Sequence, residues 1–214
     1  MAWLGLRGWG LRGRIRRRLG FLKRRLVKPP WPQAVDRVVR VHIGCGPVNA
    51  PGFINVDAQP YPHVHVVTER IEELSFLDDG TADLIYASHV VEHIPGAELA
   101  RVLEGFRRKL KPGGVLRLSV PDFDGLLAIY TDNDRDIAVI ANPLMGGQRS
   151  RFDFHCSVFT RRSLTALLTA AGFRNVRDWR PEAVRHHEFE DTASQPYVVR
   201  GKAYAHNLNL EADA

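Results

Sequence analysis

Five short stretches of the sequence carry residue types that could bind a ligand or move a proton. Glycine has no side chain, so a Gly-x-Gly pair lets the backbone approach a ligand closely and adopt positive φ angles. A carboxylate can accept hydrogen bonds from both hydroxyls of a ribose, and histidine exchanges protons near neutral pH. The stretches are Gly44-Cys45-Gly46, Asp57, residues 70–76, Ser88-His89-Val90-Val91-Glu92-His93 and Pro121-Asp122.

The elements that must position these residues form an alternation of short apolar runs and helical segments. This alternation is typical of βαβ units around a largely parallel sheet. Helices with one apolar face are expected to stop at Lys111-Pro112 and at Gly172, where proline or glycine ends them. The expected strands are residues 38–43, 53–56, 64–67, 82–86, 115–120, 175–179 and 207–212.

Four of the five stretches directly follow an expected strand. In open α/β sheets, ligands bind outside the carboxyl ends of the strands, so these residues are expected to meet at one edge of the sheet. Residues 123–157 follow at the same edge and are expected to form a lid over the acceptor.

Taken in this order, the motifs resemble those of class I S-adenosylmethionine-dependent methyltransferases, most closely the small bacterial type associated with cell-surface saccharide synthesis. The resemblance runs from about residue 38 to residue 179. It implies an α/β, Rossmann-like, seven-stranded and mostly parallel sheet with helices on both faces. The motifs are HIGCG (42–46), GFINVDA (52–58), EELSFLDDGTADLIYASHVVEHI (72–94), LKPGGVLRLSVPD (110–122) and LLTAAGF (167–173).

The resemblance also implies S-adenosyl-L-methionine as the cofactor and gives roles to individual residues. Gly44, Cys45 and Gly46 would border its methionine part, Asp57 would hold the ribose, and Ile71 would lie beside the adenine. Ser88 and His89 would line the methyl-donating end.

Three positions depart from the family pattern. Only six residues separate Gly46 from Phe53, whereas a crossover with its helix needs about a dozen, so the first helix is expected to be missing. Arg70 stands where an acidic residue is common beside the adenine, and Glu69 could substitute for it. His42 stands where many relatives have a carboxylate.

The predicted reaction is methyl transfer to a small-molecule or glycan-linked acceptor, most simply to a hydroxyl. Because a hydroxyl proton is hard to remove, a general base is expected. The predicted catalytic residues are His155, as the base, together with His89 and Asp122. The alternative functions are a nucleic-acid methyltransferase or binder that uses the basic tail, and a non-catalytic partner protein with the same fold.

The stretch His89-Val90-Val91-Glu92-His93 allows several interpretations. The H-x-x-E-H pattern occurs in some zinc proteases, and related methyltransferases use E-x-x-E-H to hold a divalent ion. We predict no metal here, with a site of His89, Glu92 and His93 as the alternative. In the simplest structural interpretation, Glu92 accepts backbone amides of the next turn and His93 packs beneath the sheet. The pairs His63 and His65, and His186 and His187, are expected to be exposed.

The chain has 214 residues and a net charge of +6, but the charge is uneven. Residues 1–30 hold ten basic and no acidic residues, so the remainder has a net charge of −4. Leucines at helical spacing, with Trp3 and Trp9, predict a basic amphipathic helix that either contacts an anionic membrane or is a solvated extension. We expect an extension over residues 1–33 and a methyltransferase domain over residues 34–214.

The composition also bears on where the chain resides. No apolar run approaches the roughly 18 residues of a membrane span, and Cys45 and Cys156 alone form no disulfide framework. We therefore expect a cytoplasmic protein, with peripheral contact at the inner face of the cell membrane as the alternative to a solvated extension.

Overall fold

The structure is a computed structural model that describes residues 11–32 and 38–214. Trp3, Leu4, Trp9 and the expected domain boundary between residues 33 and 34 lie outside the described residues.

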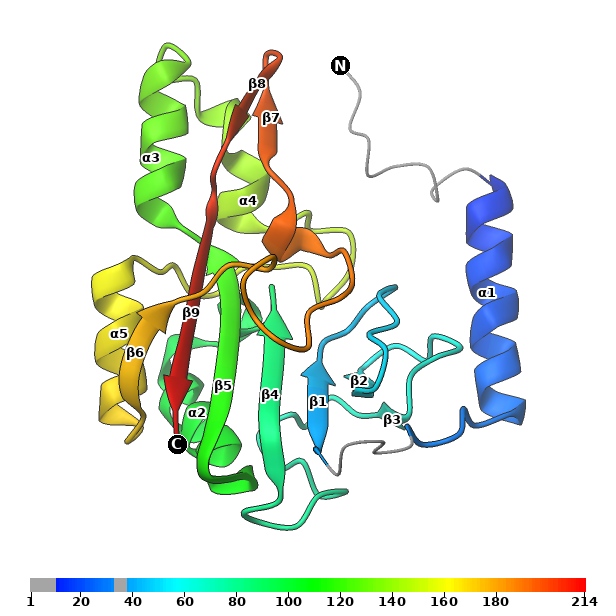
Figure 1. Cartoon of the computed structure of the whole chain (residues 1–214). Helices are drawn as coiled ribbons and strands as arrows, with labels where there is room; N and C mark the ends of the chain where they lie inside the picture. Colours follow the sequence, from blue (N-terminus) through cyan, green and yellow to red (C-terminus); the bar gives the residue numbers. More distant parts are fainter. Residues whose placement is uncertain (1–10, 33–37) are drawn as a thin grey trace.

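A seven-stranded sheet forms the centre of the molecule, in the order β3-β2-β1-β4-β5-β9-β6 (Figure 1). The pairs among β1, β2, β3, β4 and β5 are parallel, and β9 is antiparallel to both β5 and β6. The expected α/β, Rossmann-like, mostly parallel sheet is thereby confirmed. The strands are β1 (Arg40–Ile43), β2 (Ile54–Asp57), β3 (Val66–Val67), β4 (Ala82–Ser88), β5 (Leu110–Pro121), β6 (Arg174–Asp178) and β9 (Asn207–Asp213).

Two amphipathic helices, α2 (Gly96–Lys109) and α5 (Arg161–Ala170), cover one face of the sheet. Their buried side chains, such as Phe106 and Leu168, form one core with Val41, Ile43 and Ile85 of the central strands. Thr160 caps α5 with a reciprocal pair of hydrogen bonds to Ser163, which fixes where that helix begins.

The opposite face of the sheet has a different cover. The connection from β1 to β2 contains no helix, as its length predicts. Phe53 and Tyr86 on this face pack instead against Trp179, Phe189 and Ala193, from the connection that follows β6. A segment late in the chain therefore takes the place of the first crossover helix.

A smaller layer stands beyond the carboxyl ends of β4 and β5 (Figure 1). Leu126, Ile129, Ile140 and Val199 form its own apolar core. The layer contains residues 123–145, which belong to the stretch expected to form a lid over the acceptor, and it adds a hairpin that the sequence pattern did not reveal. Its elements are α3 (Phe123–Asp132), η3 (Ile137–Val139), α4 (Ala141–Met145), β7 (Tyr197–Val199) and β8 (Lys202–Tyr204).

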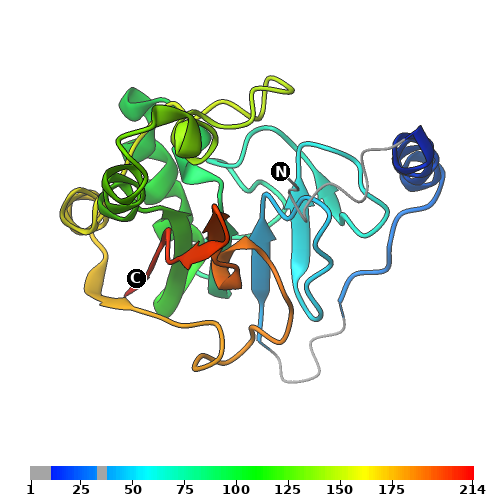
Figure 2. The ribbon, with the colours of Figure 1, turned by 90° about the horizontal axis from the view of Figure 1, so that it is seen from above.

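Helix α1 (Leu11–Leu26) lies at the β3 edge of the sheet, at the end opposite α5 (Figures 1 and 2). Arg24 is buried, and its guanidinium donates to the backbone carbonyls of Val64 and His65. Phe21 packs edge-on against Tyr61, with 5.1 Å between ring centroids. The helix is thus attached to the body through its last two turns.

Candidate functional site

The turn after β1 and the end of β2 meet through direct hydrogen bonds. The Gly46 backbone N–H donates to Asp57 Oδ2 at 2.7 Å, and the Gln59 N–H donates to Oδ1 at 2.6 Å. Gly44 and Gly46 have φ angles of 63° and 53°, in the region that favours glycine. The structure therefore brings the predicted glycines and the predicted ribose-binding carboxylate together.

The two glycines have different surroundings. A Cβ atom at Gly44 would overlap Val90 Cγ2, so this glycine lets the stretch after β4 pack against the turn after β1. A Cβ atom at Gly46 would meet no other atom within 4 Å. Gly46 therefore faces open space at the carboxyl ends of the strands, where ligands of such sheets bind.

Asp57 remains able to bind a ligand despite its burial. Burial raises the pKa of its carboxyl, and the amides of Gln59 and Gly46 oppose this rise. A carboxylate offers about four acceptor positions, and the two amides occupy one on each oxygen. The remaining acceptor positions thus fit hydroxyl donors such as those of a ribose.

The sequence predicts an exposed His63, but the half-buried ring belongs to this site. Its Nε2 lies 3.1 Å from the Gly46 carbonyl oxygen and 3.9 Å from Cys45 Sγ, and burial lowers the pKa of the ring. Strand β3 is only two residues long, so simple alternation along an edge strand did not indicate that His63 turns back over the glycine turn.

The residues at the other departures lie away from the glycine turn. His42 is buried on the opposite face among Phe53, Tyr86 and Phe189, and burial lowers its pKa to about 4. Arg70 forms an exposed ion pair with Glu73.

The residues expected beside the adenine are not all directed inward. Glu69 pairs with Arg151 on the surface. Ile71 is half-buried against the main core.

Ser88 ends β4, and His89 follows it with a φ angle of 53°, which is uncommon for a residue other than glycine. His89 Nδ1 lies 3.1 Å from Glu92 Oε1, and His89 Nε2 lies 3.1 Å from Asn207 Oδ1. Burial lowers the pKa of His89, but the hydrogen bond and charge of Glu92 outweigh it and leave the pKa raised. Both ring nitrogens are therefore engaged, and His89 is held in place.

Glu92 and His93 lie in η2 (Val91–His93), a single turn that precedes α2. The interpretation that Glu92 binds the next turn and His93 packs beneath the sheet is wrong. Glu92 pairs with His89 instead, and the half-buried His93 ring reaches the Phe154 carbonyl oxygen through Nδ1 at 2.9 Å.

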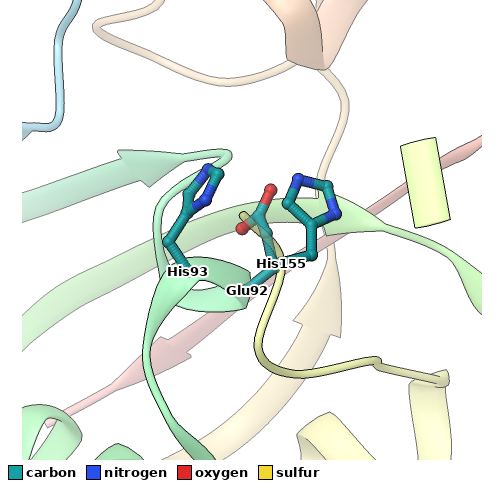
Figure 3. Close-up of side chains that lie close together, drawn as sticks. All are labelled: Glu92, His93 and His155. Atoms are coloured by element: carbon teal, nitrogen blue, oxygen red, sulfur yellow. The ribbon is translucent and has the colours of Figure 1, made fainter. Parts of the chain in front are cut away.

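His155 completes a cluster with this turn. Figure 3 shows the Glu92 carboxylate between the imidazole rings of His93 and His155. One ligand atom from each of the three residues lies within 4.8 Å of the others. Burial lowers the pKa of His155.

Asp122 lies at the end of β5 and caps α3, because its Oδ1 accepts the Asp124 N–H at 3.2 Å. Burial raises the pKa of its carboxyl.

The expected exposure of His187 is also wrong, since only 6% of this residue is exposed and it packs against Tyr86 and Trp179.

Comparisons with known proteins agree with this architecture. A methyltransferase domain family model matches residues 32–178. The chain is similar to a SAM-dependent methyltransferase from Archaeoglobus fulgidus, at 18% identity and a TM-score of 0.54, with 94% of this chain and 91% of that chain covered. No curated protein matches the sequence.

A second similar structure is that of the Burkholderia thailandensis 1,6-didemethyltoxoflavin-N1-methyltransferase with bound S-adenosylhomocysteine. The identity is 19% and the TM-score is 0.54, with 98% of this chain and 81% of that chain covered. These likenesses agree with the fold, and the family match covers most of the chain. The glycine turn, its open space and the Asp57 acceptors fit the same cofactor. The chain therefore belongs to the methyltransferase domain family and is an S-adenosylmethionine-dependent methyltransferase.

Proposed function

We propose that this methyltransferase modifies a hydroxyl of a small-molecule or glycan-linked acceptor. The observation that carries the proposal is the hydrogen bond between Gly46 and Asp57 beside open space, together with the cluster of Glu92, His93 and His155 that follows β4. In this proposal the cofactor contacts Gly44, Cys45, Gly46, Asp57, Ile71, Ser88 and His89.

S-adenosylmethionine supplies an electrophilic methyl group on a sulfonium, so the protein must orient the acceptor and remove its proton. His155 is the proposed base, because burial lowers its pKa and keeps the imidazole neutral and able to accept a proton at pH 7. His89 positions Glu92, since both of its ring nitrogens are engaged. Asp122 positions α3, the first helix of the layer above.

A hydroxyl acceptor follows from the need for a base. Nucleophiles that are unprotonated at neutral pH need only positioning, whereas a hydroxyl must lose its proton during the reaction. His155, the half-buried histidine that we propose as the base, would have no role with such a nucleophile.

Calorimetric titration with S-adenosylhomocysteine tests cofactor binding, and transfer of a labelled methyl group to a panel of sugars, nucleotide sugars and phenols tests the acceptor class. We expect His155→Ala to bind S-adenosylhomocysteine normally and to transfer methyl groups roughly 100-fold more slowly. A panel in which only amines are methylated would contradict the hydroxyl acceptor. Full activity of His155→Ala would remove His155 as the base.

Peripheral membrane contact through residues 1–30 is a second part of the proposal. Leu19, Leu22 and Leu26 recur on α1 and are 61%, 54% and 78% exposed, while Arg24 holds the other side of the helix against the body. Basic residues flank the leucines, and apolar burial together with anionic lipid attracts such a helix. Among the residues that the structure describes, none of the helices combines the length and the hydropathy of a membrane span.

Co-sedimentation with vesicles tests this contact. Wild-type protein is expected to bind phosphatidylglycerol-containing vesicles more strongly than phosphatidylcholine vesicles, and less strongly as salt increases. Leu19→Gln, Leu22→Gln and Leu26→Gln combined should abolish binding. Val198→Gln is the matched control, since Val198 is 60% exposed on β7. Equal binding by the triple variant and wild type would contradict the contact.

A further inference from the structure

We propose that Glu92, His93 and His155 bind a divalent first-row transition-metal ion. The inference rests on the proposed methyl transfer to a hydroxyl, and it deepens that proposal. One ligand atom from each residue lies within 4.8 Å of the others, although His155 is far from η2 in the sequence. The Cys156 and Ser157 N–H groups donate to the Glu92 carbonyl oxygen at 2.7 Å and 3.0 Å, which holds the two segments together.

The Glu92 carboxylate is an unusual group to find in a protein interior. Only 1% of the residue is exposed. Its Oε1 faces His89, and within the described residues Oε2 is buried without a hydrogen-bond donor. Buried carboxylates normally pair with donors or coordinate metals. A cation between the three side chains would satisfy the second oxygen.

Backbone hydrogen bonds hold both imidazoles of the cluster. His93 Nδ1 reaches the Phe154 carbonyl oxygen at 2.9 Å, and the His155 ring hydrogen-bonds to the backbone of Pro143. In a neutral histidine that donates one ring N–H to a backbone carbonyl, the other nitrogen carries no proton and is fixed in direction. Figure 3 shows both rings beside the carboxylate. His89 Nδ1, 3.1 Å from Glu92 Oε1, likewise fixes the direction of the Glu92 carboxylate.

The ligand set selects the class of ion. Two imidazoles and one carboxylate suit zinc, manganese or iron, whereas magnesium and calcium prefer oxygen ligands. Three protein ligands also leave coordination positions open, as catalytic metal sites require. Open positions would admit an acceptor oxygen, and a cation there lowers the pKa of a hydroxyl. His155 would then hold the ion, and the ion would take over the activation that we assign above to His155 as base.

Titration of the tag-free, chelator-treated protein with Co²⁺ tests the site directly through visible d–d absorption. We expect one Co²⁺ per chain, displaced by Zn²⁺. His155→Asn should weaken Co²⁺ binding by roughly 100-fold or more, given that even the loss of a supporting residue costs about 10- to 100-fold. Glu92→Gln should weaken it similarly, with circular dichroism to show that each variant is folded.

His186→Asn is the matched control. His186 lies on the connection that covers the opposite face, and its φ angle of 62° is one that asparagine tolerates. This variant should bind Co²⁺ like the wild type. A folded wild-type protein without d–d bands, or equal affinity in His155→Asn, would overturn the metal site.

Titration with S-adenosylhomocysteine separates this inference from the proposed function. Binding of S-adenosylhomocysteine without Co²⁺ binding would overturn the metal site alone. Binding of Co²⁺ by a protein that transfers methyl groups only to amines would overturn the hydroxyl acceptor and leave the metal site standing.

Discussion

The Gly46 backbone N–H donates to the Asp57 carboxylate at 2.7 Å, across eleven residues of sequence. The contact joins the turn after β1 to the end of β2 in a crossover too short for a helix. The Cys45 N–H also donates to the Val56 carbonyl oxygen at 3.1 Å, so two hydrogen bonds and the positive φ angle of Gly46 hold these ends together.

Gly46→Val is expected to abolish binding of S-adenosylhomocysteine, because the new side chain would fill the open space beside the turn. Gly80→Val is the matched control. Both glycines have positive φ angles and no atom within 4 Å of an added Cβ, so the backbone strain is alike. Calorimetry should show loss of binding for Gly46→Val only. Equal affinity in both variants would place the cofactor elsewhere.

Asp57→Ala is also expected to abolish S-adenosylhomocysteine binding and to lower the free energy of unfolding by about 2 kcal/mol, since two amides lose their acceptor. Asp178→Ala is the control, because the Asp178 side chain is 68% exposed and forms a surface ion pair with Arg161. Calorimetry and urea unfolding measure the two effects. A folded Asp57→Ala protein with normal affinity would contradict the proposed ribose contact.

Protonation of His42 is expected to destabilise the protein as the pH falls. Burial lowers the folded-state pKa to about 4, while Asp191 opposes this shift. A lowered folded-state pKa stabilises the native state above the ordinary pKa of 6.5, and this stability decreases from there toward pH 4. The loss at pH 5 is about 2 kcal/mol.

His42→Phe should remove this loss, because a phenyl ring can fill the same space among Phe53, Tyr86 and Phe189. The free energy of unfolding should therefore fall less between pH 7.5 and pH 5 than in the wild type. His206, whose pKa burial also lowers to about 4, keeps some pH dependence in the variant. Identical pH profiles would show that His42 does not titrate as described.

Asp191→Ala is expected to cost about 3 kcal/mol of unfolding free energy. The buried carboxylate accepts from the Tyr86 hydroxyl and from the Ala193 N–H at 3.0 Å, and it faces His187. Urea unfolding should show the loss, whereas Tyr86→Phe, which removes only the hydroxyl, should cost less. A decrease in unfolding free energy below about 1 kcal/mol would mean that the Asp191 carboxylate does not hold the segment that covers Phe53 and Tyr86.

Most of the sheet could be predicted from the sequence because local patterns determine it. The apolar runs gave all seven strands within a few residues, and the Lys111-Pro112 stop lies just beyond the end of α2 at Lys109. The short interval between Gly46 and Phe53 predicted the missing helix, since chain length alone forbids it. The meeting of Gly46 with Asp57 followed from the rule that ligands bind at the carboxyl ends of strands.

Contacts between distant segments could not be predicted in the same way. His63 and His187 stand in polar stretches, so the sequence predicts that both are exposed. Their actual burial depends on which distant segments pack against them, and local sequence does not record this. Glu92 and His155 lie within one cluster because the segment around His155 packs against the η2 turn. No residue spacing in the sequence predicts that contact. The β7–β8 hairpin was missed because its three-residue strands carry little alternation.

The cover that Trp179, Phe189 and Ala193 provide for Phe53 and Tyr86 has a consequence for biosynthesis. Because the covering segment is translated after β1, β2 and β4, a ribosome exposes these strands while one side of them still lacks its apolar partner. Such a nascent chain relies on long-range contacts, which form slowly, so chaperone contact should be greatest before residues 179–193 leave the exit tunnel.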